Sequence, residues 1–188
     1  MSLKTITREY EGFLEDRKSR FLAFLVPIEQ FDTRLEELRK EHRKANHIVT
    51  AHRRLLDEDR IEESGKDDGE PAGTSGMPTL RVLQGADLIN CAVLIVRYFG
   101  GTKLGGGGLA RAYSGAAQDA IANAELVPFQ KLSRKRVSAD FASSSELERK
   151  ITGLGLDVVS RDYTETGVVL IVEGPEDLLD ALDGSADG

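Results

Sequence analysis

The sequence has little of what marks several specialised classes of protein. It contains a single cysteine, Cys91, so an internal disulfide cannot form, which fits a reducing compartment. No apolar run approaches the roughly 20 residues that a helix needs to cross a bilayer. The N-terminus also lacks the basic-then-apolar pattern of a signal peptide. These absences predict a cytoplasmic protein.

Positive charge is also in short supply. The 188 residues include 25 Lys and Arg against 32 Asp and Glu, a net charge of −7. Residues 131–188 carry 7 basic and 12 acidic residues, a net of −5, and the rest carry 18 and 20, a net of −2. Such a balance argues against a general DNA-coating protein. The length suits one large domain or two small ones.

The most distinctive composition lies in residues 67–115. An acidic loop rich in Gly, Pro, Thr and Ser covers residues 67–77, and residues 88–96 form an apolar run that predicts a strand buried on both faces. A glycine tract, residues 100–108, then leads into a segment with helical spacing. Glycine lets backbone amides turn toward a neighbour without interference from Cβ. We therefore expect this stretch to contact a ligand or another chain.

Periodicity predicts the other elements of the first part of the chain. Before the glycine tract we expect a hairpin of two strands, residues 5–10 and 20–26, and then a helix over residues 33–45. A strand over residues 47–55 and a second helix over residues 78–85 should follow. Thr33 and Glu36 have the spacing of a capping box. The segment that ends at Lys66 shows no apolar periodicity beyond Ile61 and predicts no regular element. Val127-Pro128-Phe129 is interpreted as a linker.

The residues after the linker predict the order β-α-β-β-α. We expect a strand over residues 134–142 and a helix over residues 143–154. A hairpin of residues 156–163 and 168–172 should follow, and then a short last helix over residues 175–182. This order is one strand short of the ferredoxin-like pattern. The tail, residues 183–188, has no strand signal. We therefore expect either a homodimer through the unpaired strand edge or a mobile C-terminus.

Four segments carry a family resemblance: KSRFLAFLVP, KANHIVTAHR, GEPAGTSGMP and RYFGGTKLGGGGLARAYSG. They resemble the YigZ/IMPACT family over about residues 1–125. The resemblance implies an α+β protein whose N-terminal domain, residues 1–127, has the second-domain fold of ribosomal protein S5. It also implies a smaller ferredoxin-like domain, residues 132–188, similar to the last domain of elongation factor G and truncated here.

The resemblance also implies a function. Eukaryotic relatives regulate translation initiation by competing for the activator of a stress kinase, and they carry a further partner-binding domain ahead of this one. The matched region starts almost at Met1, so the chain resembles the short bacterial type. We expect a non-enzymatic binding protein whose partner is a translation-related protein, a structured RNA or the ribosome.

The candidate contact surface follows from the acidic loop, the end of the apolar strand and the glycine tract. It comprises Asp68, Gly69, Glu70, Arg97, Tyr98, Lys103, Gly105, Gly107, Gly108 and Arg111. In this hypothesis the two acidic residues meet a basic partner and the three Lys and Arg residues meet an anionic one. A helix start following a strand favours anions through its free amides. The alternative is a flexible glycine loop needed only for close packing.

Other chemistry has weaker support. Gly105, Gly107 and Ala110 satisfy G-x-G-x-x-A, but six positions separate Phe99 from Gly105, too many for a dinucleotide-binding turn. The acidic loop alone has too few oxygen ligands for a hard cation. We assign no cofactor, metal or catalytic residue. The second hypothesis is a small phosphate- or metal-dependent hydrolase or transferase that uses the glycine tract and the acidic loop.

Basic residues form separate clusters at residues 17–20, 39–44, 53–54 and 131–136. On an acidic protein such clusters are usually solvated surface. If the sheet gathers them on one face, they suit structured RNA, which proteins recognise through phosphates and shape.

Overall fold

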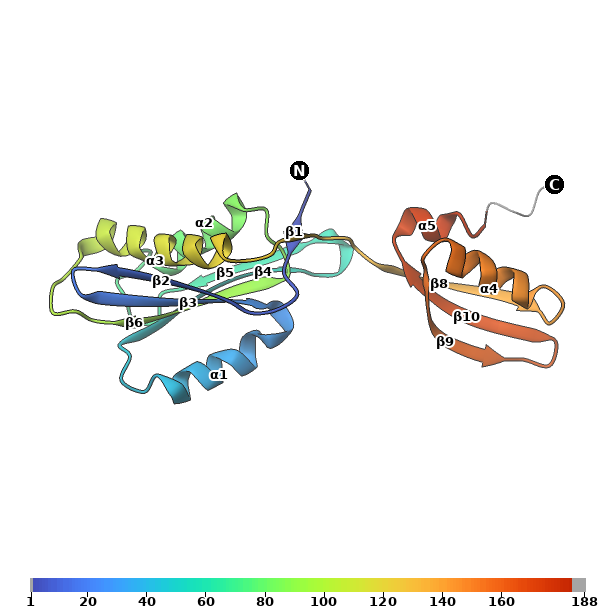
Figure 1. The fold of residues 1–188 in the computed structure, drawn as a ribbon, viewed down its shortest axis with the longest axis horizontal. Helices are drawn as coiled ribbons and strands as arrows, with labels where there is room; N and C mark the ends of the chain where they lie inside the picture. Colours follow the sequence, from blue (N-terminus) through green and yellow to red (C-terminus); the bar gives the residue numbers. More distant parts are fainter. Residues whose placement is uncertain (1, 184–188) are drawn as a thin grey trace. The chain divides into compact units, whose positions relative to one another are not determined.

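The computed structural model describes residues 2–183, which form a mixed α/β fold. The chain divides into two compact units, residues 1–129 and 130–188, which we call the N-terminal and C-terminal units (Figure 1). Among the described residues, no helix combines the length and the apolar character that crossing a bilayer requires.

A five-stranded antiparallel sheet forms the centre of the N-terminal unit. Its strand order is β2-β3-β6-β4-β5, with the bounds Tyr10–Asp16, Ser19–Pro27, Cys91–Tyr98, His47–Leu55 and Ile61–Lys66. The central strand, β6, is buried at every position except Tyr98, which is half-buried. The apolar run therefore predicted the central strand of the sheet, which is buried on both faces.

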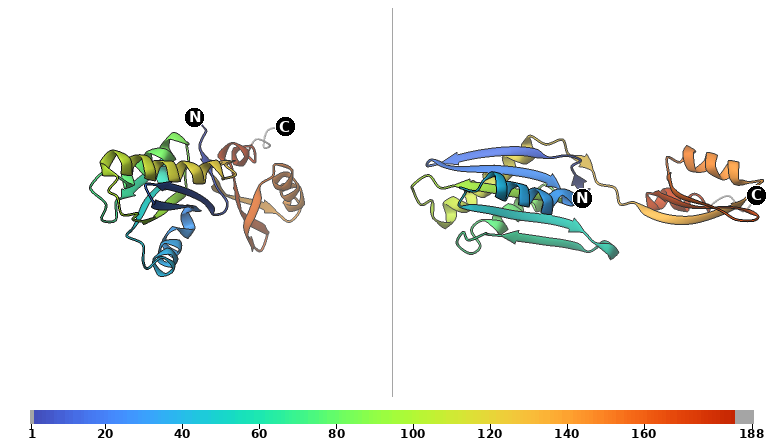
Figure 2. Two further views of the ribbon diagram at one scale, coloured as in Figure 1. Left: turned by 60° about the vertical axis from the view of Figure 1, so that its left-hand side comes forward. Right: turned by 90° about the horizontal axis from the view of Figure 1, so that it is seen from below.

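Helices cover both faces of this sheet (Figures 1 and 2). Helix α1, Phe31–Glu41, packs on one face through Leu38. Helices α2, Gly76–Gly85, and α3, Gly105–Ala122, pack on the other. The buried residues of α3 are mostly small, which brings its backbone close to the sheet: a Cβ added to Gly12 of β2 would lie 2.3 Å from the amide nitrogen of Ala120.

The N-terminal hairpin differs from its prediction. The chain turns at Arg17 and Lys18, where a turn was expected, and both residues have positive φ, 46° and 65°. However, the hairpin partner of β3 is β2, which begins at Tyr10, the last residue of the predicted strand. The short strand β1, Lys4–Thr5, instead pairs with β7, Val127–Pro128. The segment interpreted as a linker is therefore held by the N-terminus.

Three further expectations are corrected. Residues 61–66 form the edge strand β5, although their pattern predicted no element. The Thr33–Glu36 capping box is absent, because α1 begins at Phe31 after Gln30, without a side-chain cap. Helix α3 begins at Gly105, so the second half of the glycine tract is the first turn of a helix and not a loop.

The C-terminal unit has the element order that its sequence pattern predicted. It consists of β8, α4, β9, β10 and α5, with the bounds Ser133–Asp140, Ser144–Gly153, Asp157–Tyr163, Gly167–Gly174 and Glu176–Asp180. The antiparallel strand order is β8-β10-β9. Its core joins the helices to the buried face of β10 through Ile151, Leu170 and Leu179. Residues 184–188, which hold most of the tail expected to lack a strand, lie outside the described residues.

Candidate functional site

Segments distant in sequence meet at the end of β6. The amide of Phe99 donates to Oδ1 of Asn46 at 2.8 Å, which joins the residue after β6 to the residue before β4. The next residue, Gly100, packs against the β2–β3 turn: its amide donates to Oγ of Ser19, and an added Cβ would lie 2.1 Å from the carbonyl carbon of Lys18. Glycine is therefore required at position 100 by close backbone contact.

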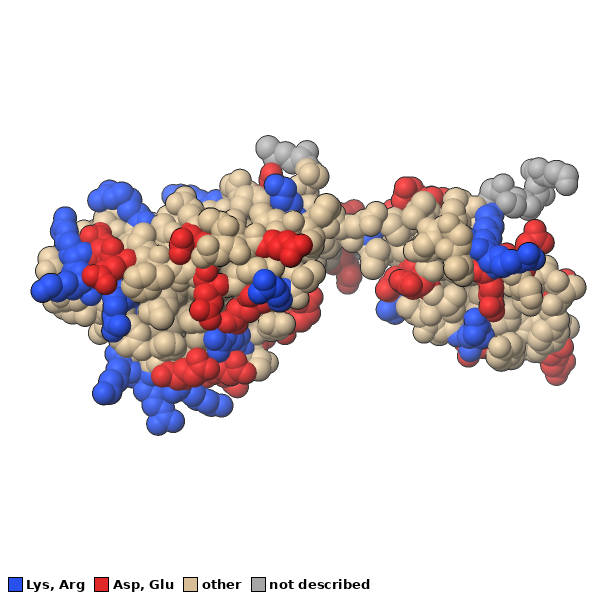
Figure 3. Space-filling model, in the orientation of Figure 1, with Lys and Arg blue, Asp and Glu red and all other residues tan. Residues whose placement is uncertain are grey.

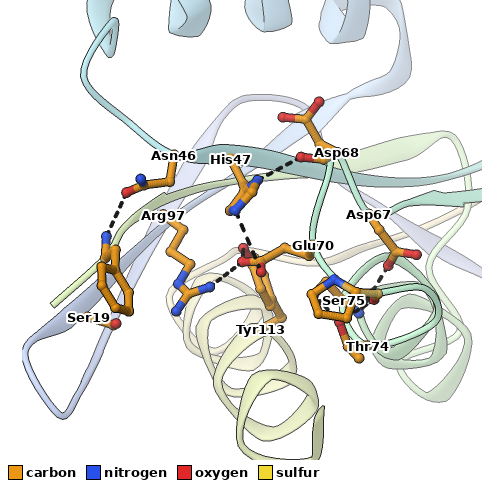
Figure 4. Close-up of polar contacts among 12 residues, drawn as sticks. Ser19, Asn46, His47, Asp67, Asp68, Glu70, Thr74, Ser75, Arg97 and Tyr113 are labelled. Carbon is orange, nitrogen blue, oxygen red and sulfur yellow. Dashed lines mark hydrogen bonds and ion pairs between the residues drawn. The ribbon is translucent and has the colours of Figure 1, made fainter. Parts of the chain in front are cut away.

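A buried polar cluster lies beneath this end of the sheet (Figure 4). Oε1 of Glu70 accepts hydrogen bonds from Nη1 of Arg97 and from the hydroxyl of Tyr113, both at 2.6 Å. The side chains of Glu70 and Arg97 are only 3% and 7% exposed. The ring of Phe21 packs edge-on against Tyr113, with 4.9 Å between ring centroids. The cluster is thus an internal ion pair with an aromatic wall.

The environment of this cluster fixes proton positions. Burial, followed by the hydrogen bond to Glu70, raises the pKa of Tyr113 far above its usual value, so its hydroxyl remains a donor. Nδ1 of His47 lies 2.7 Å from the carbonyl oxygen of Asp68. Because a carbonyl only accepts, this nitrogen carries a proton. Nε2 of His47 then faces Oε2 of Glu70 at 3.7 Å.

The acidic loop is held together by its own carboxylates. Asp67 accepts backbone amides from Gly73, Ser75 and Gly76 at 2.8, 3.1 and 2.8 Å, and so satisfies amides at the start of α2. Burial opposes ionisation of Asp67, but these three amides outweigh it, and the pKa of the carboxyl is lowered. Asp67 was not among the candidate contact residues, and its role here is to shape the loop.

Asp68 is exposed but also has a structural partner. Its Oδ2 accepts the amide of Ile48 at 2.7 Å, and its backbone has a φ of 49°. It borders a hollow of about 190 Å³ together with Arg39 and Arg43 of the α1 region. Asp68 therefore lies beside basic residues of its own chain.

These contacts change the interpretation of the acidic residues. Glu70 and Arg97 were expected to meet two different partners, but they are buried and pair with each other. The carboxylates of Asp67, Asp68 and Glu70 all accept hydrogen bonds from protein donors. Within residues 2–183, no group of three His, Cys, Asp or Glu side chains is placed to hold a metal ion.

The glycine tract supplies an uncapped helix start. Leu104, the residue before α3, makes no side-chain capping bond, and the first amides of a helix have no acceptor within it. The acidic loop lies close by, since a Cβ on Gly106 would be 3.6 Å from Cγ2 of Thr74. Arg111 reaches back along the helix, because a Cβ on Gly107 would be 3.2 Å from its Nη1. Gly108 is buried against Leu104.

Tyr98 points to the other face of the sheet. Its hydroxyl lies 2.7 Å from Nδ1 of His42, which holds the end of α1 near the end of β6. The guanidinium of Arg20 stacks on its ring at 5.0 Å. Tyr98 is therefore not brought together with Glu70 and Arg97.

Exposed basic side chains gather at this end of the N-terminal unit (Figure 3). They come from the β2–β3 turn, the second half of α1 with the residues after it, and the segment from the end of β6 into α3. We call them the basic end: Arg17, Lys18, Arg39, Lys40, Arg43, Lys44, Lys103 and Arg111. Arg53 does not join them, because it is buried against Glu63 and the carbonyl of Leu88. Residues 131–136 belong mainly to β8 of the other unit.

Two solved structures resemble the whole chain or part of it. A crystal structure of a hypothetical protein is 26% identical, covers 98% of this chain and 91% of its own, and has a TM-score of 0.72. The two-domain translational regulator Yih1 is 28% identical over 62% of this chain and 47% of its own. Its TM-score is 0.42, which is too low to show a shared fold.

Sequence comparison gives closer relationships. YvyE of Bacillus subtilis is 32% identical over 76% of this chain, and an IMPACT family member of Haemophilus influenzae is 41% identical over 57%. The matches span 65% and 53% of those two relatives. YigZ of Escherichia coli is 30% identical over 79% of this chain and 74% of its own. The model of the Impact N-terminal domain matches residues 17–121, and the chain therefore belongs to the IMPACT family.

Proposed function

We propose that this chain is a non-enzymatic, cytoplasmic binding protein that acts on translation through contact between its basic end and structured ribosomal RNA. Membership of the IMPACT family supports the link to translation, together with the resemblance to eukaryotic regulators of initiation. The proposal extends that role to a chain whose matches cover only part of its first two relatives.

One observation carries the choice of RNA as partner. Three basic segments lie at the end of the N-terminal unit where β6 ends, and one of them leads into the uncapped start of α3, although the protein as a whole is acidic (Figure 3). Lysine and arginine bind phosphates and release counterions, and helix amides add anion contacts. Phe99, which is 48% exposed, offers one aromatic surface at the same end. A single aromatic suits recognition of backbone and shape more than stacking on successive bases.

The finer fold assignment is also a proposal. We propose that the N-terminal unit has the fold of the second domain of ribosomal protein S5, and that the C-terminal unit is ferredoxin-like. In support, β8, β10 and β9 lie in the order first, third and second, as in a β-α-β-β-α-β fold. Within residues 2–183, β8 pairs only with β10. Its other edge is the proposed contact for a homodimer, and a monomer in sedimentation equilibrium would contradict this.

The test of the RNA contact reverses two charges of the basic end. In Lys18→Glu with Lys103→Glu, co-sedimentation with purified ribosomes at low salt should be lost, and the wild type should lose it only at high salt. The melting temperature should hardly change, because exposed charges contribute little to folding. Arg60→Glu with Lys66→Glu makes the same charge change on exposed residues around β5 and should still co-sediment. Intact binding by the first variant, or equal loss in both, would overturn the proposal.

A further inference from the structure

A groove with a volume of about 750 Å³ runs between α2 and α3, and each helix contributes one stripe of its surface to the lining. Pro78 and Val82 of α2, and Ala86 directly after it, recur every four residues, the spacing of a single helix face. The α3 side of the groove is lined by residues that include the partly buried Ile121 and the exposed Arg111. Of the residues that line the groove, the hypotheses from the sequence used only Arg111.

The charge of the groove is opposite to that of the protein. Its lining contains two charged residues, Arg81 and Arg111, and no Asp or Glu. Both arginines are exposed, and neither guanidinium makes an ion pair or hydrogen bond with a residue between 2 and 183. In a chain with 32 acidic residues, a hollow bordered only by free positive charge favours an acidic occupant.

We propose that this groove docks an acidic amphipathic helix of a protein partner, as a surface that shares only Arg111 with the proposed RNA contact. The apolar stripe would receive the partner's apolar face, and Arg81 and Arg111 would pair with carboxylates beside that face. Helix α2 has 10 residues and is about 15 Å long, which matches about three turns of a partner helix. Anchors at i, i+4 and i+7 fit this length.

RNA fits the groove less well. None of its lining residues is aromatic, so it provides no surface on which bases can stack. The apolar stripe would also remain without a partner against a phosphate backbone. Protein is the class of partner that uses both the apolar and the cationic parts of the lining.

Gly85 provides a direct way to block the groove. It lines the groove at the last position of α2, and a Cβ added there meets nothing within 4 Å. Gly85→Leu therefore places a bulky side chain at the groove, and its Cβ meets no atom of the fold. Gly153 ends α4 in the same open situation, so Gly153→Leu is its matched control in the C-terminal unit. Arg111 borders both proposed surfaces and stays unchanged in both tests.

The probe is a synthetic amphipathic helix of about 15 residues, with leucine at the anchor positions and glutamate beside them. It should bind the full chain in fluorescence anisotropy and shift backbone amide signals of α2 and α3 in NMR. Replacing its glutamates by lysines should abolish binding. Gly85→Leu and Arg81→Glu should each weaken binding at least about tenfold, and Gly153→Leu should leave it unchanged.

Three results would overturn the proposal: no binding of the acidic peptide, equal binding of the lysine peptide, or stronger shifts of the same amides by an RNA hairpin. The ribosome assay separates this inference from the proposed RNA contact. Arg81→Glu should co-sediment with ribosomes like the wild type, and Lys18→Glu with Lys103→Glu should bind the peptide normally.

Discussion

The sheets of the two units differ in how they are covered. Helices pack on both faces of the five-stranded sheet, and its central strand β6 is buried from Cys91 to Arg97. In the three-stranded sheet, half-buried and exposed positions alternate along β8, and every residue of β9 is exposed. A strand between two helical layers needs a continuous apolar sequence, whereas a strand with one open face needs only alternation.

The same contrast changes the meaning of an ion pair. Glu70 and Arg97 meet at 2.6 Å with both side chains buried. Glu173 and Arg134 meet at 2.7 Å in the C-terminal unit with side chains 28% and 66% exposed. The distances are alike, but water can replace a lost partner only in the second pair. Burial, and not geometry, should therefore decide what each pair contributes to stability.

The largest expected effect comes from breaking the buried pair. Glu70→Ala leaves the guanidinium of Arg97 buried without its anion and Tyr113 without its acceptor, which should cost about 3–5 kcal/mol of unfolding free energy. The matched change Glu173→Ala should cost at most about 1 kcal/mol. Urea denaturation of both variants gives the comparison. If both variants lose a similar amount of unfolding free energy, burial of the Glu70–Arg97 pair does not determine its contribution to stability.

The next effect concerns close packing at glycine. In Gly12→Ala the new methyl group would lie 2.3 Å from the amide nitrogen of Ala120 and 2.7 Å from the carbonyl oxygen of Ala116, so the α3 backbone must move. We expect a loss of about 1–3 kcal/mol. In Gly174→Ala the methyl group meets Cδ2 of Leu156, the end of a side chain that can rotate. Thermal unfolding should therefore show a smaller loss for the second variant.

A smaller effect should depend on pH. The pKa of Asp67 is lowered in the folded chain, because its three amide bonds outweigh the opposing burial. Its contribution is therefore fully present above its pKa in the unfolded chain and is lost as pH falls through the folded pKa. Asp67→Asn should cost about 1 kcal/mol at neutral pH, as the loss of a helix-start acceptor does. In acid the stabilities of the two proteins should converge.

Asp140 is the counterpart of Asp67 in the C-terminal unit. The hydroxyl of Ser143, followed by its amide, lowers the pKa of Asp140 in a fully exposed setting before α4. Asp140→Asn should give a pH-dependent difference of the same sign but smaller size. Denaturation curves over a pH series measure both variants. A gap between Asp67→Asn and the wild type that stays constant down to acid pH would contradict the assigned role.

Local pattern predicted the strands and helices whose faces are buried. Residues 47–55 are β4 as expected, and the apolar run 88–96 includes most of β6, which ends at Tyr98. The pattern missed β5 because this edge strand is polar and mostly exposed. It also placed the strand before the Arg17-Lys18 turn too early, because residues 5–10 and β2 both mix apolar and polar residues.

The contacts of the candidate site were beyond local pattern. Glu70 is 27 positions from Arg97 and 43 from Tyr113, and no spacing rule connects them. They meet because β4 lies between β6 and β5 in the sheet, which brings the loop after β5 beside the end of β6. The sequence selected both members of the ion pair but could not show that they pair with each other.

The smallest expected effect tests the independence of the two units. A fragment of residues 1–129 retains both buried cores of the N-terminal unit and the pairing of β1 with β7. Its stability should therefore equal that of the same unit in the full chain, measured by urea denaturation with circular dichroism. A fragment of residues 1–126 lacks β7 and the hydrogen bond from the amide of Phe129 to the carbonyl of Leu3, so it should be somewhat less stable. If fragment 1–129 is unfolded and the full chain is folded, the N-terminal unit needs the C-terminal unit, and the two-domain organisation fails.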